Sequence, residues 1–234
     1  MYAGLKEIGA SLTHLFFPHV CQGCGSDLLD KNQLVCLHCY NQLPATQFHL
    51  HQANPVEKIF WGRISVEAAA SLLYFTKGSV LQQLLHQLKY KGNQEIGRFL
   101  GNEMGKQFIQ SDRFAAIDGL VPLPLFGSRE KKRGYNQAKI IADGFSSATG
   151  IPVWNEVIRR TRSTETQTHK SRLARWMNME GRFELVNPAQ ISFKKILLID
   201  DVLTTGATLE SCGHELLRAE GCSLSIGTIA YTSS

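Results

Sequence analysis

The stretch ILLIDDVLTTGATL, residues 196–209, decides how the chain is interpreted. Its four apolar residues lead into two adjacent aspartates, Asp200 and Asp201, and threonines then surround a single glycine, Gly206. The apolar run over 194–200 is typical of a strand that is buried on both faces. The pattern after it predicts a turn from Leu203 to Thr208 that leads into a helix. In parallel sheets ligands bind beyond the carboxyl ends of strands, so we expect a binding site here.

The residue types in this turn favour a sugar phosphate. Backbone N–H groups and the positive end of the following helix attract an anion, and Gly206 lets the backbone approach it closely. The hydroxyls of Thr204, Thr205 and Thr208 add donors, whereas ionised Asp200 and Asp201 only accept hydrogen bonds. Carboxylates would repel a bare phosphate, but they suit the vicinal hydroxyls of a ribose whose 5′-phosphate lies in the turn. The alternative is an acidic strand end that only caps a helix.

Strand-like and helix-like segments alternate around this stretch. Strands are predicted over 65–75, 116–125, 156–161, 194–200 and 223–232. Helices are predicted over 80–92, 95–110, 136–150 and 207–221. This alternation predicts an α/β fold with a mostly parallel sheet flanked by helices.

Four cysteines near the start of the chain, Cys21, Cys24, Cys36 and Cys39, form two C-x2-C pairs. Four thiolates at this spacing suit a tetrahedral Zn²⁺ ion with no position left open for catalysis, so the metal is expected to be structural. Two disulfides are the alternative, which is typical of secreted chains. We therefore divide the chain into a helix and zinc module over 1–45, a polar linker over 46–64 and a body over 65–234.

Composition and charge set broad limits on function. The chain has 234 residues, 43% of them hydrophobic, and a formal net charge of +5, which permits a phosphate-bearing partner. The first twenty residues predict a short amphipathic helix rather than a signal peptide, because charged residues interrupt a short apolar run. Since no segment approaches the roughly 18 apolar residues of a membrane span, we expect a cytoplasmic protein.

Two segments, 127–138 and 159–178, concentrate basic residues. Positive charge there suits an anionic leaving group or a nucleic-acid backbone, and a solvated polar surface is the alternative. The candidate contacts are Arg133, Arg160, Arg162, Lys170 and Arg172.

The stretch around Asp200 resembles the signature of type I phosphoribosyltransferases that binds phosphoribosyl pyrophosphate (PRPP). The resemblance implies that Asp200 and Asp201, the candidate catalytic residues, hold the ribose hydroxyls. It also implies Mg²⁺, held largely by PRPP and water. The segment expected to bind PRPP comprises Asp200, Asp201, Val202, Leu203, Thr204, Thr205, Gly206, Ala207 and Thr208.

The order of motifs narrows the resemblance further. Four cysteines are followed by KYKG (89–92), VPLP, RGYNQA, QTHKSRLARWMNMEGRF and finally DDVLTTGATL. In this order the chain resembles the ComF family, competence-associated relatives of phosphoribosyltransferases. The resemblance implies a type I phosphoribosyltransferase fold with an N-terminal zinc finger. It also implies a role in natural transformation, with single-stranded DNA and DNA-processing proteins as partners.

Two hypotheses follow: an enzyme that transfers a phosphoribosyl group, or a binding module for single-stranded DNA or a nucleotide that keeps the phosphate loop without turnover.

Overall fold

The computed structural model describes residues 19–27, 29–30, 33–126, 133–161 and 183–232. The helix predicted near the N-terminus lies outside these residues, as do Arg162, Lys170 and Arg172. No helix within the described ranges is both long and apolar enough to cross a membrane.

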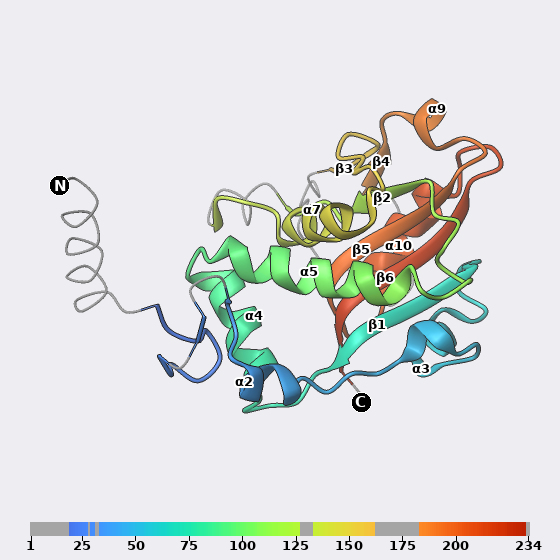
Figure 1. Cartoon of the computed structure of the whole chain (residues 1–234). Coiled ribbons are helices and arrows are strands. Elements are labelled where there is room, and N and C mark those ends of the chain that lie inside the picture. Colours follow the sequence, from blue (N-terminus) through green and yellow to red (C-terminus); the bar gives the residue numbers. More distant parts are fainter. Residues whose placement is uncertain (1–18, 28, 31–32, 127–132, 162–182, 233–234) are drawn as a thin grey trace, which may run out of the picture.

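The centre of the molecule is a four-stranded parallel sheet in the order β1-β6-β5-β2 (Figure 1). Its strands are β1 (Ala68–Tyr74), β2 (Gly119–Pro122), β5 (Lys195–Leu203) and β6 (Ser223–Tyr231). The residues from Ile196 to Ile199 are fully buried, as expected for a strand covered on both faces. The predicted α/β fold with a parallel sheet is therefore confirmed.

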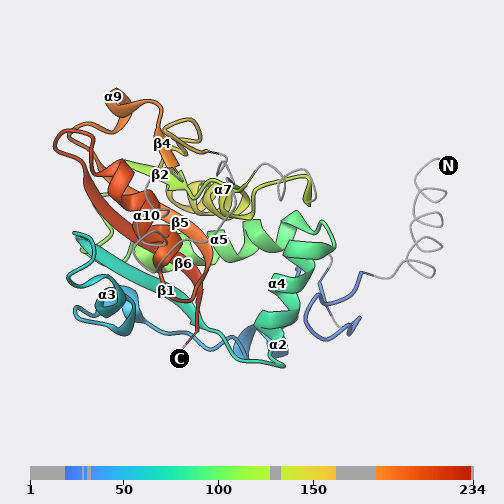
Figure 2. The ribbon, with the colours of Figure 1, turned by 180° about the vertical axis from the view of Figure 1, so that it is seen from behind.

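Helices cover both faces of this sheet. Helices α5 (Gln94–Phe108) and α7 (Gln137–Thr149) pack side by side on one face, and α10 (Ala207–Leu216) lies on the other (Figures 1 and 2). Helix α4 (Val80–Tyr90) extends from the end of α5 towards α2 (Leu37–Asn41) in the cysteine module. Helix α10 ends five residues before Gly221, where the helix was expected to close.

Residues 46–64 pack onto the body, so their interpretation as a polar linker is corrected. They form the 3-10 helix η1 (Phe48–Leu50) and helix α3 (Pro55–Phe60), which bury Phe48, Val56 and Phe60. The Asn54 side chain caps α3 and donates a 2.9 Å hydrogen bond to the Ala69 carbonyl of β1. The apolar residues of this segment form short groups, such as Ile59 to Trp61, with no sustained helix or strand period, so the sequence pattern did not reveal the packing.

A second, antiparallel sheet lies apart from the first. It pairs β3 (Ile158–Arg160) with β4 (Phe183–Leu185), and the short helix α9 (Pro188–Ile191) follows. The strand predicted over 156–161 exists, but it belongs to this small sheet rather than to the parallel one.

Candidate functional site

The acid pair lies near the carboxyl end of β5 but within the strand. Strand β5 continues three residues beyond Asp200, because its pairing with β6 extends as far as Leu203 and Tyr231. Leu203 is only 1% exposed, and its carbonyl accepts a 3.1 Å hydrogen bond from the Thr232 backbone N–H. The expectation that Leu203 begins the turn was therefore wrong, and the turn consists of residues 204–206.

The turn and the start of α10 enclose a small hollow of about 50 Å³. Gly206 precedes the helix with a φ of 75°, a left-handed conformation that glycine adopts without strain. Glycine has no side chain to cap the helix, so the first N–H groups of α10 are available to an anion. The hollow is lined by Asp200, Val202, Leu203, Thr204, Thr205, Gly206, Ala207, Thr208 and Leu209. The structure thus brings Asp200 and the predicted loop residues together, whereas Asp201 faces a different partner.

Asp200 has an unusual protonation equilibrium. Burial, followed by the neighbouring charge of Asp201, raises its pKa from 3.8 to about 7. A 2.8 Å hydrogen bond from the Asp201 backbone N–H and the charges of Lys89 and Arg160 act in the opposite direction. Asp200 therefore changes between its neutral and ionised forms close to neutral pH.

Asp201 forms an ion pair with Lys89, at the end of α4. The Lys89 Nζ lies 2.8 Å from Asp201 Oδ2, and the two side chains are 23% and 13% exposed. In the sequence, KYKG is only part of a family pattern, and nothing in it places Lys89 in the site. Residues 89 and 201 are far apart in the chain, so no local spacing could have predicted this contact.

Residues of the corrected linker support the phosphate loop from behind. Arg63 donates a 3.0 Å hydrogen bond to the Thr205 carbonyl and forms an ion pair with Glu210 in the first turn of α10. A Cβ atom on Gly206 would lie 2.8 Å from Ile59 Cγ2, so only glycine fits between the loop and α3. Sequence analysis missed this support as well, because Arg63 follows no recognisable motif.

Two of the predicted basic contacts lie within the described residues. The Arg133 guanidinium donates a 2.7 Å hydrogen bond to Gln137 Oε1 and stacks 5.6 Å from the ring centroid of Tyr90. The Arg160 guanidinium carbon lies 3.7 Å from the ring centroid of Phe126. Because Arg160 also lowers the pKa of Asp200, its charge acts on the acid pair.

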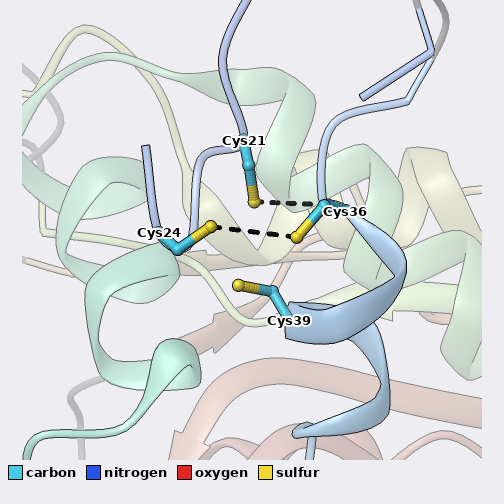
Figure 3. A group of neighbouring side chains, drawn as sticks. All are labelled: Cys21, Cys24, Cys36 and Cys39. Carbon is cyan, nitrogen blue, oxygen red and sulfur yellow. Dashed lines mark hydrogen bonds between the residues drawn. The ribbon is translucent and has the colours of Figure 1, made fainter. Parts of the chain in front are cut away.

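The four cysteines form one cluster, in which all Sγ atoms lie within 4.8 Å of one another (Figure 3). Cys21 and Cys24 come from a loop, while Cys36 caps α2 and Cys39 lies within it. Burial raises the pKa of Cys21, but hydrogen bonds from backbone N–H groups, foremost that of Cys36 at 3.2 Å, outweigh it and lower the pKa to about 6. Burial and hydrogen bonds with the other three cysteines raise the pKa of Cys39. It is therefore the convergence of the four sulfurs, rather than a shared tendency to ionise, that fits a tetrahedral zinc ion.

The cysteine module rests on α4 and α5. The Gln87 side chain of α4 donates a 2.6 Å hydrogen bond to the Gln22 carbonyl. The Tyr40 hydroxyl donates a 2.6 Å hydrogen bond to Glu103 of α5, which raises the pKa of Tyr40 to about 12. Helix α4 therefore contacts the module near Gln87 and the acid pair through Lys89.

A comparison with protein families matches residues 131–233 to the phosphoribosyl transferase domain. The match includes the whole segment from Asp200 to Thr208. The DNA utilization protein YhgH of Escherichia coli K12 is 28% identical over 217 residues, which cover 91% of this chain and 90% of that protein. Competence protein F of Haemophilus influenzae is 27% identical and covers 89% of this chain and 88% of its own length. Competence protein ComFC of Bacillus subtilis is 30% identical over 62% of this chain and 56% of its own length.

These relatives and the matched domain support the resemblance of the chain to the ComF family. The similarity of the chain to the YhgH and competence F proteins spans the cysteine module as well as the body. Among solved structures, a glutamine PRPP amidotransferase from B. subtilis matches with a TM-score of 0.40 and 19% identity. That match covers 57% of this chain and 26% of the amidotransferase.

Proposed function

We propose that this ComF-like protein binds PRPP with Mg²⁺, or a related ribose phosphate, at residues 200–208 and acts in DNA uptake. The observation that supports this most directly is that Asp200 and the loop up to Thr208 line one hollow at the start of α10. Carboxylate acceptors and uncapped N–H donors in one place are complementary to the two ends of a ribose 5-phosphate.

Each part of the ligand has a matching group in this proposal. The N–H groups at the start of α10, with the hydroxyls of Thr204, Thr205 and Thr208, hold the 5′-phosphate. Asp200 and Asp201 accept hydrogen bonds from the ribose hydroxyls. Mg²⁺ would be held largely by the pyrophosphate of PRPP and by water, and it would neutralise pyrophosphate charge.

For an enzyme, the reaction is transfer of a phosphoribosyl group. The bond between ribose C1 and the pyrophosphate oxygen breaks, pyrophosphate takes the electron pair, and an acceptor nucleophile forms the new bond to C1. Arg133 and Arg160 supply positive charge for the leaving group, and the same role is proposed for Arg162, Lys170 and Arg172. Most of the rate enhancement would come from positioning and electrostatics.

Calorimetry with PRPP and Mg²⁺ tests the assignment. We expect Asp200→Asn combined with Asp201→Asn to abolish binding while the protein stays folded. Asp143→Asn is the matched control, because Asp143 pairs with Lys139 on the surface of α7. Unchanged PRPP affinity in the double variant would refute the assigned roles.

The proposed role in DNA uptake is supported by the relatives, which are named for DNA utilization and competence. In this proposal the module over 1–45 binds structural Zn²⁺ through Cys21, Cys24, Cys36 and Cys39, and the metal supplies most of its folding free energy. The body over 65–234 binds the ribose phosphate. Thiolates that hold zinc rather than form disulfides agree with a cytoplasmic location.

A second candidate is a non-catalytic module that binds single-stranded DNA. Its support is the stacking of Arg133 on Tyr90 and of Arg160 on Phe126, which combines positive charge with aromatic rings. We expect the protein to retard a labelled oligonucleotide in a gel at low salt, and Arg160→Ala with Arg162→Ala to abolish this. Arg218→Ala, on the exposed surface beyond α10, is the control. An unmutated chain that leaves the oligonucleotide unshifted would remove this candidate.

A further inference from the structure

The contact between Lys89 and Asp201 brings a cation from a distant helix into the acid pair. Among the described residues, Asp201 is the ion-pair partner of this ammonium, at 2.8 Å. An ammonium can donate three hydrogen bonds, and the Lys89 side chain remains 23% exposed. It can therefore donate to a second anion while it keeps its ion pair with Asp201.

Folding alone gives a weak reason for this ion pair. Helix α4 is already anchored by four buried leucines and by a hydrogen bond from the Tyr135 hydroxyl to the Leu88 carbonyl. Removing a lysine and an aspartate from most of their solvent costs free energy that their attraction only partly returns. A functional reason is therefore needed for a lysine in this position.

The charge of the expected ligand supplies that reason. PRPP brings a negatively charged pyrophosphate to a site that already contains two adjacent carboxylates. Negative charges that lie close together repel one another. Of the basic residues within the described ranges, Lys89 and Arg160 are those whose charges act on Asp200. Ribose 5-phosphate lacks the pyrophosphate and so needs such a cation much less.

We propose that Lys89 is a specificity-determining residue: it holds Asp201 in position for the ribose hydroxyls and places its ammonium against the pyrophosphate, so that the site prefers PRPP to ribose 5-phosphate. This inference rests on the proposed function of residues 200–208. It assigns Lys89, the first residue of the KYKG segment, to the ligand site and gives α4 a role in both the module and the site.

Calorimetry with two ligands, PRPP with Mg²⁺ and ribose 5-phosphate with Mg²⁺, tests the inference. Loss of a charge-assisted hydrogen bond predicts that Lys89→Met weakens PRPP binding by about tenfold more than ribose 5-phosphate binding. Lys89→Arg keeps the charge and should restore most of the preference. Lys91→Met is the matched control, because Lys91 is exposed and just two residues away, and it should change neither affinity.

The outcomes separate this inference from the proposed function. If the unmutated protein binds neither ligand, the proposed function fails and the inference falls with it. If the unmutated protein binds PRPP, but Lys89→Met leaves both affinities unchanged or lowers them equally, the inference alone is overturned. Should Lys89→Met fail to fold, Lys89→Gln is compared with wild type, because an amide of similar length removes the positive charge and should lower the ratio of PRPP affinity to ribose 5-phosphate affinity. An unchanged ratio would contradict the inference.

Discussion

The cysteine module and the acid-loop site differ in where their supporting residues come from. The module takes its four ligand atoms from nineteen consecutive positions, Cys21 to Cys39, and spacing alone brings them together. The acid-loop site takes its binding groups from residues 200–208 but its support from Arg63 and Lys89, which are distant in sequence. Local motifs therefore identify both sites, whereas only the fold reveals what holds the second one in shape.

This difference predicts how each region responds to a single change. The module should depend mainly on its metal, because a short segment with few buried apolar residues cannot fold on burial alone. Its hydrogen bonds to α4 and α5 add smaller contributions. The acid-loop site should stay folded after most substitutions and lose affinity by degrees, according to how many supporting contacts are removed.

The largest effect is expected for Cys39→Ser. Structural zinc contributes about 10–16 kcal/mol in small zinc modules, and loss of one thiolate removes the tetrahedral site. We expect zinc content to fall from one ion per chain to none, measured by atomic emission, while circular dichroism shows that the body keeps its helices. Cys222→Ser is the control, since this thiol is outside the cluster. Full zinc content in Cys39→Ser would show that the cluster is not a four-cysteine site.

Gly206→Ala should have the next largest effect. Alanine in the left-handed region costs about 1–2 kcal/mol, and its Cβ would collide with Ile59. We therefore expect PRPP affinity to fall by at least about tenfold, measured by calorimetry. Gly78 has nearly the same φ, 76°, but a Cβ atom there would meet no other atom. Gly78→Ala therefore measures the effect of the left-handed backbone conformation without a steric collision. Normal PRPP binding by Gly206→Ala would mean that the loop does not contact the ligand.

Arg63→Ala should have a smaller effect on affinity. It removes the hydrogen bond to the Thr205 carbonyl. It also removes the ion-pair partner of Glu210, whose negative charge lies in the first turn of α10, where we expect the phosphate to bind. We expect a three- to tenfold loss of PRPP affinity, on the order of 1 kcal/mol. Adding Glu210→Gln should recover part of the loss, because it removes the repelling charge. If the second substitution lowers the affinity further, the proposed balance of charge is wrong.

The smallest effect concerns pH. Since the pKa of Asp200 is raised to about 7, more of this carboxylate is ionised above that pH, and PRPP should bind more tightly as pH rises through 7. Folding has the opposite dependence, because the folded protein holds this proton to a higher pH than the unfolded chain does. The contribution of Asp200 to the free energy of unfolding is therefore favourable at low pH and declines as the pH rises from about 4 to 7.

Asp200→Asn isolates this pH effect. The phosphates of the ligand also titrate near pH 6, and their contribution remains in the variant. The difference between wild type and Asp200→Asn, in calorimetry and in thermal unfolding from pH 5 to 8, belongs to Asp200. Parallel curves for the two proteins would contradict the raised pKa.

Much of the fold could be predicted, because the strands and helices around residues 80–150 and 194–231 follow clear apolar periodicities. The length of β5 could not, since its last residues, up to Leu203, are fixed by pairing with β6 rather than by their own pattern. The packing of residues 46–64 was missed because their apolar residues follow no sustained period of a helix or strand. The candidate binding residues were predicted from local chemistry, while the contacts of Arg63 and Lys89 with this segment exist only in the folded chain.

The central claim is that the β5–α10 turn holds a phosphate while the acid pair holds the attached ribose. A crystal structure of the protein with PRPP and Mg²⁺ tests it most directly. The account predicts the 5′-phosphate on the N–H groups at the start of α10 and the ribose hydroxyls within hydrogen-bond distance of Asp200 and Asp201. A ligand bound elsewhere, or the reverse orientation with the phosphate on the aspartates, would contradict it.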